Sequence, residues 1–258
     1  FLLSVLFRNR FQFKEIYFPC LVGYATHGFL DSCTSYGTFL LWPFSNERVA
    51  WNIIAIVDPI FTACLLVGMI QGIRKKRPAW ARWALICSFL YLSFGYYQYQ
   101  RASEIQQTLA EQRGHSIERG RVKPSVGNNL LFRSYYQFEG RYYVDAIRIP
   151  WWGEATTYEG TNVEQLGMDE FISTHTLSEI QARDLERFAH FSAGYLIEHP
   201  DYPQVVGDLR YAFLPNSIAP LWGVEWTSGA SSHHMPFHHF RGMSVEIREK
   251  YWAMLKGE

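Results

Sequence analysis

Cysteine is scarce in this 258-residue sequence and is confined to its first 87 residues. The four cysteines are Cys20, Cys33, Cys64 and Cys87, and residues 88–258 contain none. This distribution excludes a disulfide framework, and it excludes a cysteine-based zinc module in the C-terminal part of the chain. We expect the four thiols to be reduced and buried.

Several motifs of well-understood chemistry are also missing. The sequence has no glycine-rich phosphate loop, no Gly-x-Ser-x-Gly elbow and no cysteine–histidine arrangement that would form a nucleophile. Its 24 basic residues balance 24 acidic ones, and the polar half has no dense basic patch. We therefore expect no nucleic-acid partner.

Apart from two short loops, at residues 47–48 and 74–82, residues 16–100 are nearly free of charge. Asp31 is the one charged residue from 16 to 46, Asp58 is the one from 49 to 73, and residues 83–100 have none. Because about 20 apolar residues cross a bilayer, we predict membrane spans over roughly 14–33, 49–73 and 80–100. A globular protein with several buried helices is the alternative interpretation.

Basic residues predict how these spans are oriented. They precede the first span and fill the loop at residues 74–77, and the positive-inside rule places both segments in the cytoplasm. Everything after Arg101 then lies outside. The chain opens on an apolar run at Phe1 that has the composition of the end of a membrane helix, so we expect its true N-terminus to be missing.

The polar half has the pattern of an α+β domain. We predict a helix over 101–113, a hairpin over 130–147 that turns at Glu139-Gly140, a helix over 177–197 after Thr176, strands over 205–214 and 221–226, and a helix over 240–255. Residues 150–176 are expected to be irregular. The predicted fold is thus an α-helical transmembrane bundle at 1–100, followed at 101–258 by a small α+β soluble domain with helices on one face of an antiparallel sheet.

His27 and Asp31 are the residues most indicative of chemistry. An ionisable residue inside a membrane span is costly and usually functional. Their i, i+4 spacing puts the imidazole and the carboxylate on one helix face, which Thr34 joins. This pair is suited to zinc, manganese or iron, although a catalytic zinc needs about three protein ligands. A histidine–aspartate hydrogen bond that only joins helices is the alternative.

Asp58 lies in the next predicted span and is followed by Pro59. Its depth favours a catalytic role, as a third ligand or as a carboxylate that orients His27. The alternative is a carboxylate that caps a helix broken by the proline.

The order of several short segments resembles a known family, the bacterial inner-membrane metal-dependent hydrolases described as LexA-binding, membrane-associated hydrolases. The segments are Thr26-His27-Gly28-Phe29-Leu30-Asp31-Ser32-Cys33-Thr34-Ser35-Tyr36-Gly37-Thr38, Leu41-Trp42-Pro43-Phe44-Ser45, Ile56-Val57-Asp58-Pro59, Gly207-Asp208-Leu209-Arg210-Tyr211 and Pro220-Leu221-Trp222-Gly223-Val224. The family is distantly similar to zinc-dependent phospholipases C. It also carries an upstream His-Arg-x-x-Thr-His element that this sequence does not contain.

The resemblance implies a protein of the bacterial inner membrane in which His27 and Asp31 bind a divalent metal, zinc first and manganese second. Asp58 would be catalytic, with Thr34 and Trp42 in supporting positions. The expected reaction is attack of metal-activated water on a phosphoester or lipid-like substrate at the bilayer. A non-enzymatic scaffold that binds a protein through its outer domain, and an ion or proton transporter, are the rival functions.

Two further groups of polar residues carry weaker expectations. His233, His234, His238 and His239 are four histidines within seven positions, which favours an adventitious or structural role over a metal site because no carboxylate accompanies them. Asp208 and Arg210 are two apart on a predicted strand and so share one face. An ion pair that organises the sheet is the preferred interpretation, with substrate contact as the alternative.

Overall fold

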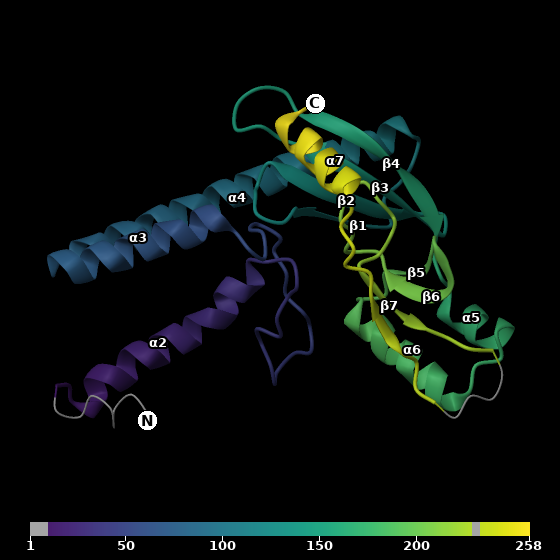
Figure 1. The fold of residues 1–258 in the computed structure, drawn as a ribbon, viewed down its shortest axis with the longest axis horizontal. Helices are drawn as coiled ribbons and strands as arrows, with labels where there is room; N and C mark the ends of the chain where they lie inside the picture. The colour runs from purple at the N-terminus through teal and green to yellow at the C-terminus, as the bar shows by residue number, and fades with distance from the viewer. Residues whose placement is uncertain (1–9, 229–232) are drawn as a thin grey trace. The chain divides into compact units, whose positions relative to one another are not determined.

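The computed structural model describes residues 10–228 and 233–258. Contacts divide the chain into two compact units (Figure 1). The helical unit comprises Phe1–Tyr99 and Val126–Asn129, and the α+β unit comprises Gln100–Ser125 and Leu130–Glu258. The predicted boundary lay between residues 100 and 101, and the return of residues 126–129 to the helical unit was not foreseen.

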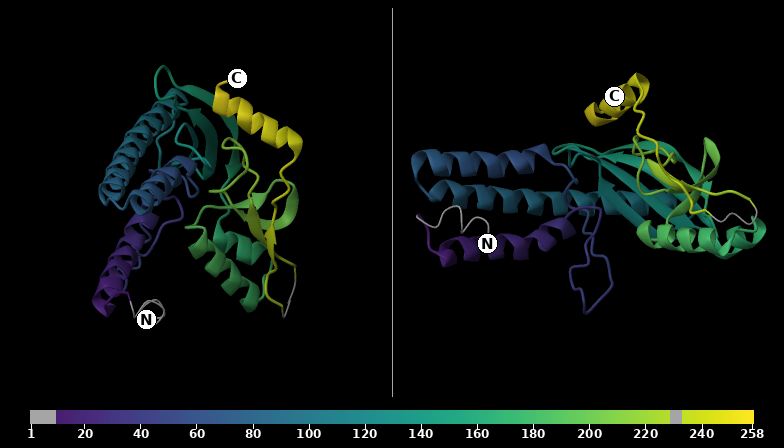
Figure 2. Two further views of the ribbon diagram at one scale, coloured as in Figure 1. Left: turned by 60° about the vertical axis from the view of Figure 1, so that its left-hand side comes forward. Right: turned by 60° about the horizontal axis from the view of Figure 1, so that its bottom comes forward.

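The helical unit contains α2 (Phe13–Ser32), α3 (Pro59–Lys75) and the first part of α4 (Ala79–Gln112). Helix α2 starts where the Glu15 carboxylate accepts a hydrogen bond from the Gln12 backbone N–H at 2.7 Å. Helix α3 starts at Pro59, whose fixed φ suits the first helical position, and ends at Lys76 with a left-handed φ of 51°. Helices α3 and α4 lie side by side and antiparallel (Figures 1 and 2).

The prediction of a transmembrane bundle is wrong for this structure. Within residues 10–228 and 233–258, no helix combines the length and the apolarity needed to cross a membrane. Helix α3 has 17 residues, α2 contains Lys14, Glu15, His27 and Asp31, and α4 turns polar from Gln98 onward. The sequence stretches are nearly free of charge, but the helices inside them are shorter or more polar than the stretches suggest. The multi-pass topology derived from them is not supported.

The first sheet of the α+β unit has four antiparallel strands in the order β1-β2-β3-β4. They are β1 (Arg119–Pro124), β2 (Leu131–Phe138), β3 (Arg141–Arg148) and β4 (Thr156–Glu164). The predicted hairpin is confirmed, since β2 and β3 pair from Leu131↔Arg148 to Phe138↔Arg141. Glu139 and Gly140 both have positive φ, 47° and 70°, as the tight hairpin turn requires.

A second four-stranded antiparallel sheet follows, in the order β5-β6-β7-β8. Its strands are β5 (Leu196–His199), β6 (Tyr202–Asp208), β7 (Trp222–Glu225) and β8 (Phe237–His239). Helices α5 (Met168–Thr174) and α6 (Glu179–Phe191) pack on this sheet, and α7 (Val245–Lys256) closes the chain (Figure 2). The single sheet that was predicted is therefore two sheets.

Two buried clusters hold the α+β unit together. In one, Leu185 and Phe188 of α6 pack on Leu196, Val206 and other residues of the second sheet. In the other, Tyr135, Tyr142 and Val144 of the first sheet contact Tyr195, Ile197 and Leu209. The α7 helix lies against the first sheet, where Tyr158 Oη donates to the Met254 carbonyl at 3.2 Å. The second cluster makes the two sheets one structural unit.

Several helices and strands begin or end at residues other than those predicted. The helix expected over 177–197 ends at Phe191 and is capped by Ser178 rather than Thr176, because the Ser178 hydroxyl accepts from the Gln181 N–H at 3.3 Å. The strand expected over 205–214 is β6, which ends at Asp208. Residues 150–176, expected to be irregular, contain β4 and α5.

Candidate functional site

The His27/Asp31 pair lies near the C-terminal end of α2. His27 Nδ1 is 3.5 Å from Asp31 Oδ2, and the two side chains are 70% and 51% exposed. Thr34 donates its hydroxyl to the Asp31 backbone carbonyl at 2.8 Å, so it is tied to the same helix end. The sequence-predicted juxtaposition of an imidazole and a carboxylate is present, and both are accessible to a ligand.

These two donors fit a metal only in part. Within residues 10–228 and 233–258, no group of three histidine, cysteine, aspartate or glutamate side chains is close enough to hold an ion. Imidazole nitrogen and carboxylate oxygen are suitable ligand types, but a catalytic zinc needs about three protein ligands. The pair supplies two side chains of suitable type, which is one fewer than a catalytic zinc needs.

Asp58 occupies the N-cap of α3 and is only 4% exposed. Its Oδ1 accepts hydrogen bonds from the backbone N–H groups of Ile60 and Phe61, both at 3.0 Å. Its Oδ2 accepts from Tyr91 Oη of α4 at 2.8 Å. Burial, together with this bond to Asp58, raises the pKa of Tyr91. The geometry accounts for Asp58 as a cap that joins α3 to α4, while its catalytic role stays a prediction.

Trp42 lies in the loop between α2 and α3 and is 69% exposed. The peptide bond from Trp42 to Pro43 is cis. The loop is closed by a bridge between Thr38 and Val49, and a further backbone bond joins Trp51 N–H to the Ser32 carbonyl at 2.7 Å. A supporting role for Trp42 in a metal site stays a prediction.

The histidines at positions 233–239 do not share one site, because His234 and His238 contact different carboxylates. His234 Nδ1 lies 2.8 Å from Asp184 Oδ2 of α6, and His238 Nε2 lies 2.7 Å from Glu225 Oε2 of β7. Carboxylates therefore do accompany two of these histidines, but each is distant in sequence. The contacts attach β8 and the segment before it to α6 and β7, which is a structural role.

Asp208 and Arg210 form a buried ion pair, with side chains 0% and 5% exposed. Arg210 Nη2 is 2.8 Å from Asp208 Oδ2, and Trp222 Nε1 donates to the same oxygen at 3.3 Å. Next to them, a Cβ on Gly207 would overlap the Pro220 ring. The two C-terminal motifs that suggested the resemblance thus pack directly on each other, and the ion pair organises the sheet.

His199, at the end of β5, is expected to make the stability of the α+β unit depend on pH. It is 4% exposed, and burial lowers its pKa below the ordinary value of 6.5. The unfolded chain therefore takes up a proton first as the pH falls, so stability is lost from about pH 6.5 downward and is fully present above it. We expect urea titrations to show a stability slope of up to about 1.4 kcal/mol per pH unit for this single group.

A matched pair of variants tests the assignment to His199. His199→Asn should abolish that part of the slope between pH 7.5 and pH 5.5, a window of about two units around the ordinary histidine pKa. His239→Asn, at an exposed position on β8, should keep it. An unchanged slope in the His199 variant would contradict the assignment.

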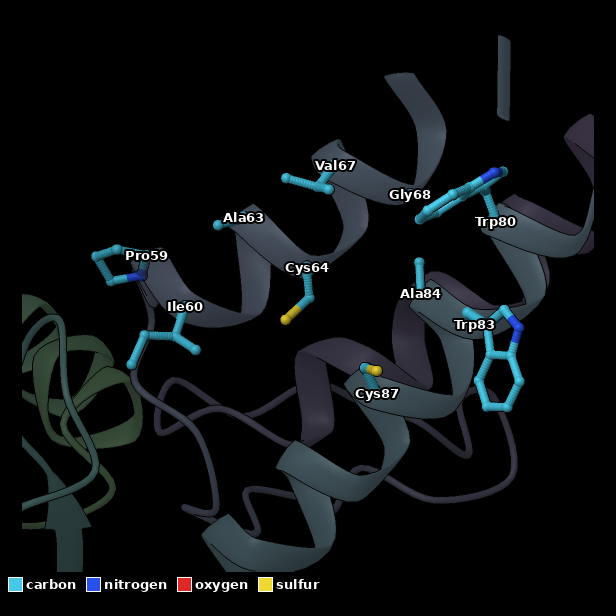
Figure 3. A pocket seen from close by; sticks show the side chains of 10 residues that line it. All are labelled: Pro59, Ile60, Ala63, Cys64, Val67, Gly68, Trp80, Trp83, Ala84 and Cys87. Atoms are coloured by element: carbon cyan, nitrogen blue, oxygen red, sulfur yellow. The ribbon is translucent and has the colours of Figure 1, made fainter. Parts of the chain in front are cut away.

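A groove between α3 and α4 was missed from the sequence. Figure 3 shows it, with a volume of about 530 Å³ and a lining that is entirely apolar or sulfur-bearing. The lining residues are Pro59, Ile60, Ala63, Cys64, Val67, Gly68, Trp80, Trp83, Ala84 and Cys87. At one end, Lys75 Nζ lies 4.3 Å from the centre of the Trp80 ring. The groove is thus apolar along its length with a cation at one end.

Gly68 sets how closely the two helices approach. A Cβ at Gly68 would overlap the Cβ of Ala84, whereas a Cβ at Gly23 of α2 would meet nothing within 4 Å. We expect Gly68→Ala to lower the free energy of unfolding of the helical unit by about 1–3 kcal/mol through overpacking. Gly23→Ala should instead raise it by about 0.5–1 kcal/mol, because alanine favours a helix. Equal effects of the two variants on urea unfolding, followed by circular dichroism, would refute the close approach.

Comparison with known proteins finds a family match for the N-terminal part of this chain. Residues 1–102 match the family described as YdjM inner membrane protein. No curated protein and no solved structure matches the chain. The family description supports the inner-membrane part of the expected resemblance and does not extend to hydrolysis or to similarity with phospholipases C. Over residues 1–102, which include α2, α3 and the His27/Asp31 pair, the chain is similar to the YdjM family of inner membrane proteins.

Proposed function

We propose that this chain is a membrane-associated hydrolase that depends on a divalent metal, zinc first and manganese second, with a phosphoester or lipid-like substrate. The observation that carries the proposal is the exposed His27/Asp31 pair, whose donor atoms lie 3.5 Å apart on one helix face. Similarity of residues 1–102 to an inner-membrane family supports a lipid environment.

His27 and Asp31 would hold the ion as two of its ligands. A metal bound there would supply a hydroxide nucleophile at neutral pH and polarise the scissile bond. Thr34 would position Asp31 through its hydrogen bond to the backbone carbonyl of that residue. Because all three groups belong to the last turns of α2 or follow them directly, their relative positions are fixed by the helix.

The proposal treats Asp58 as a positioning residue. To accept a proton or bind a metal, its carboxylate would have to give up hydrogen bonds to Ile60, Phe61 and Tyr91. Loss of those bonds would uncap α3 and separate it from α4. With these bonds in place Asp58 acts on the site by fixing the fold of the helical unit, and the catalytic role expected of its carboxylate requires them to open.

The α3–α4 groove supports a lipid-like substrate class. Its length is lined by apolar side chains, which suit an acyl chain, and Lys75 beside Trp80 offers a positive charge to a phosphate. An apolar groove next to a cation is complementary to an anionic phospholipid.

Metal analysis of the purified full chain tests the proposal. The protein would be incubated with zinc, dialysed, and assayed for bound metal and for hydrolysis of bis(p-nitrophenyl) phosphate. We expect His27→Ala and Asp31→Asn each to weaken zinc binding at least about tenfold, because each removes one of only about three protein ligands. His239→Ala, which removes an exposed histidine from β8, should bind zinc as the natural chain does.

Other outcomes separate the rival functions. Stoichiometric zinc that survives both substitutions would sink the assigned site. A chain that binds no metal would favour the non-enzymatic scaffold, and zinc that enters vesicles containing the protein would favour transport.

A further inference from the structure

A cleft of about 450 Å³ lies at the start of β6 in the α+β unit, and none of the residues used above for metal binding lines it. Its walls come from the β5–β6 turn, from β6, β7 and β8, and from the segment after β8. The charged and aromatic side chains of its lining are Asp201, Tyr202, Glu225, His238 and Phe240. The cleft is thus built from segments far apart in sequence that the second sheet brings together.

One wall of this cleft is aromatic. The Tyr202 and Phe240 rings are stacked, with centroids 4.7 Å apart and planes 20° apart. His199 packs behind them, 4.8 Å from the Tyr202 ring and 4.4 Å from the Phe240 ring. Tyr202 nevertheless remains 50% exposed, so part of its ring is open to the cleft. A buried imidazole thus supports the stack from behind and fixes the open ring.

The charges in the cleft are negative. The Asp201 carboxylate makes no hydrogen bond or ion pair with any residue that the structure describes, while Glu225 Oε2 lies 2.7 Å from His238 Nε2. Neither lysine nor arginine lines the cleft. An aromatic face with a nearby carboxylate attracts a cation through the ring quadrupole and through direct charge attraction.

The type of cation follows from the same groups. The residues described here contain no cluster of three metal-ligating side chains, so the carboxylates are too dispersed to enclose a metal ion. A quaternary ammonium group is large, weakly hydrated and drawn to aromatic faces. We infer that this cleft is a binding site for a small organic cation of the quaternary-ammonium class, held between the open face of Tyr202 and the carboxylates of Asp201 and Glu225.

Calorimetric titration of the full chain tests this inference with choline as the probe. Its uncharged isostere 3,3-dimethylbutan-1-ol has the same shape, so any difference between the two reports the charge. We expect choline to bind at least about tenfold more tightly than the isostere, since a partly desolvated cation–aromatic contact contributes up to about 2 kcal/mol. Tyr202→Leu, which keeps apolar bulk without the aromatic face, should weaken choline binding by about three- to thirtyfold.

Asp201→Asn provides a second variant at an exposed position, where loss of folding is not expected. It should weaken choline binding several-fold and reduce the dependence of binding on salt. Asp169→Asn, in the exposed first turn of α5, is the control and should bind choline as the natural chain does. Equal binding of choline and its isostere, or unchanged choline binding in both the Tyr202 and the Asp201 variants, would overturn the inference.

Discussion

Replacing Arg133 with methionine is expected to lower the free energy of unfolding of the α+β unit by about 3–5 kcal/mol. Arg133 lies on β2 and is 3% exposed. Its Nη1 donates to the carbonyls of Pro215 and Ser217 at 2.8 and 2.7 Å, and its Nη2 donates to that of Leu209 at 2.7 Å. Methionine fills much of the volume but donates nothing, so the substitution leaves several buried carbonyls without a donor.

Burial of the Arg133 guanidinium disfavours its charged form and so lowers its pKa. Burial lowers the pKa of Arg133 to about 10, and the same low-polarity surroundings together with the Arg133 charge lower the pKa of Lys123 well below its usual value. Lys123 instead lies over the Tyr211 ring, with Nζ 3.2 Å from its centre. The carbonyls of the 209–217 loop are therefore the groups that make a buried arginine tolerable.

Urea-dependent hydrogen exchange of β2 measures the effect of Arg133→Met without interference from the helical unit. Arg141→Met is the matched control, because Arg141 begins the neighbouring strand β3 and its side chain is 43% exposed. That variant should cost less than about 1 kcal/mol, as is usual for an exposed ion pair. If the two variants lose the same amount of protection, Arg133 does not hold the loop.

How far the sequence could predict this fold is clearest at the β2–β3 hairpin. Two runs rich in aromatic and aliphatic residues and the Glu139-Gly140 turn between them were sufficient, since both signals are local and the turn needs two positive φ angles. Strand β4 carried no such signal. Its burial pattern is mostly exposed, and its glycine at 160 is required by a tertiary contact, because a Cβ there would overlap the carbonyls of Val144 and Asn216.

The prediction for the helical unit was wrong for a different reason. The stretch at 49–73, in which Asp58 is the one charged residue, predicted a continuous helix, but Asp58 and Pro59 start a helix inside it. A proline that follows aspartate in a sequence can either break a helix or mark the start of one. The start holds here, and the Asp58 carboxylate caps α3 by accepting hydrogen bonds from Ile60 and Phe61, and it accepts a third from Tyr91.

The candidate site was predictable only where it is local. His27 and Asp31 are one helical turn apart, so their proximity follows from the sequence once the helix is assigned. The cleft beside Tyr202 needed the second sheet, which pairs β6 with β7 and β7 with β8. A site whose walls are brought together by strand pairing cannot be predicted from the spacing of residues in the sequence.

Replacing Asp208 with asparagine is the second substitution with a large expected effect, a loss of about 3 kcal/mol or more from the stability of the α+β unit. The Asp208 side chain is fully buried and accepts from Arg210 Nε and Nη2 at 2.9 and 2.8 Å. Without the carboxylate, the Arg210 cation keeps a bond to the Phe191 carbonyl at 2.7 Å but has no counter-charge. Urea-dependent hydrogen exchange of β6 would report the loss.

A double substitution tests whether the ion pair itself or the hydrogen-bond network around it stabilises the sheet. If the pair only organises the sheet, Asp208→Leu combined with Arg210→Met should recover most of the stability lost in Asp208→Asn, because an apolar pair of similar volume avoids the cost of burying two charges. Trp222 Nε1 would lose its acceptor in the double variant, so recovery should fall short by about 1 kcal/mol. A double variant no more stable than the single one would mean that the surrounding polar groups, Trp222 first, depend on the carboxylate more than Arg210 does. The motif at 207–211 would then owe its composition to this hydrogen-bond network rather than to the ion pair.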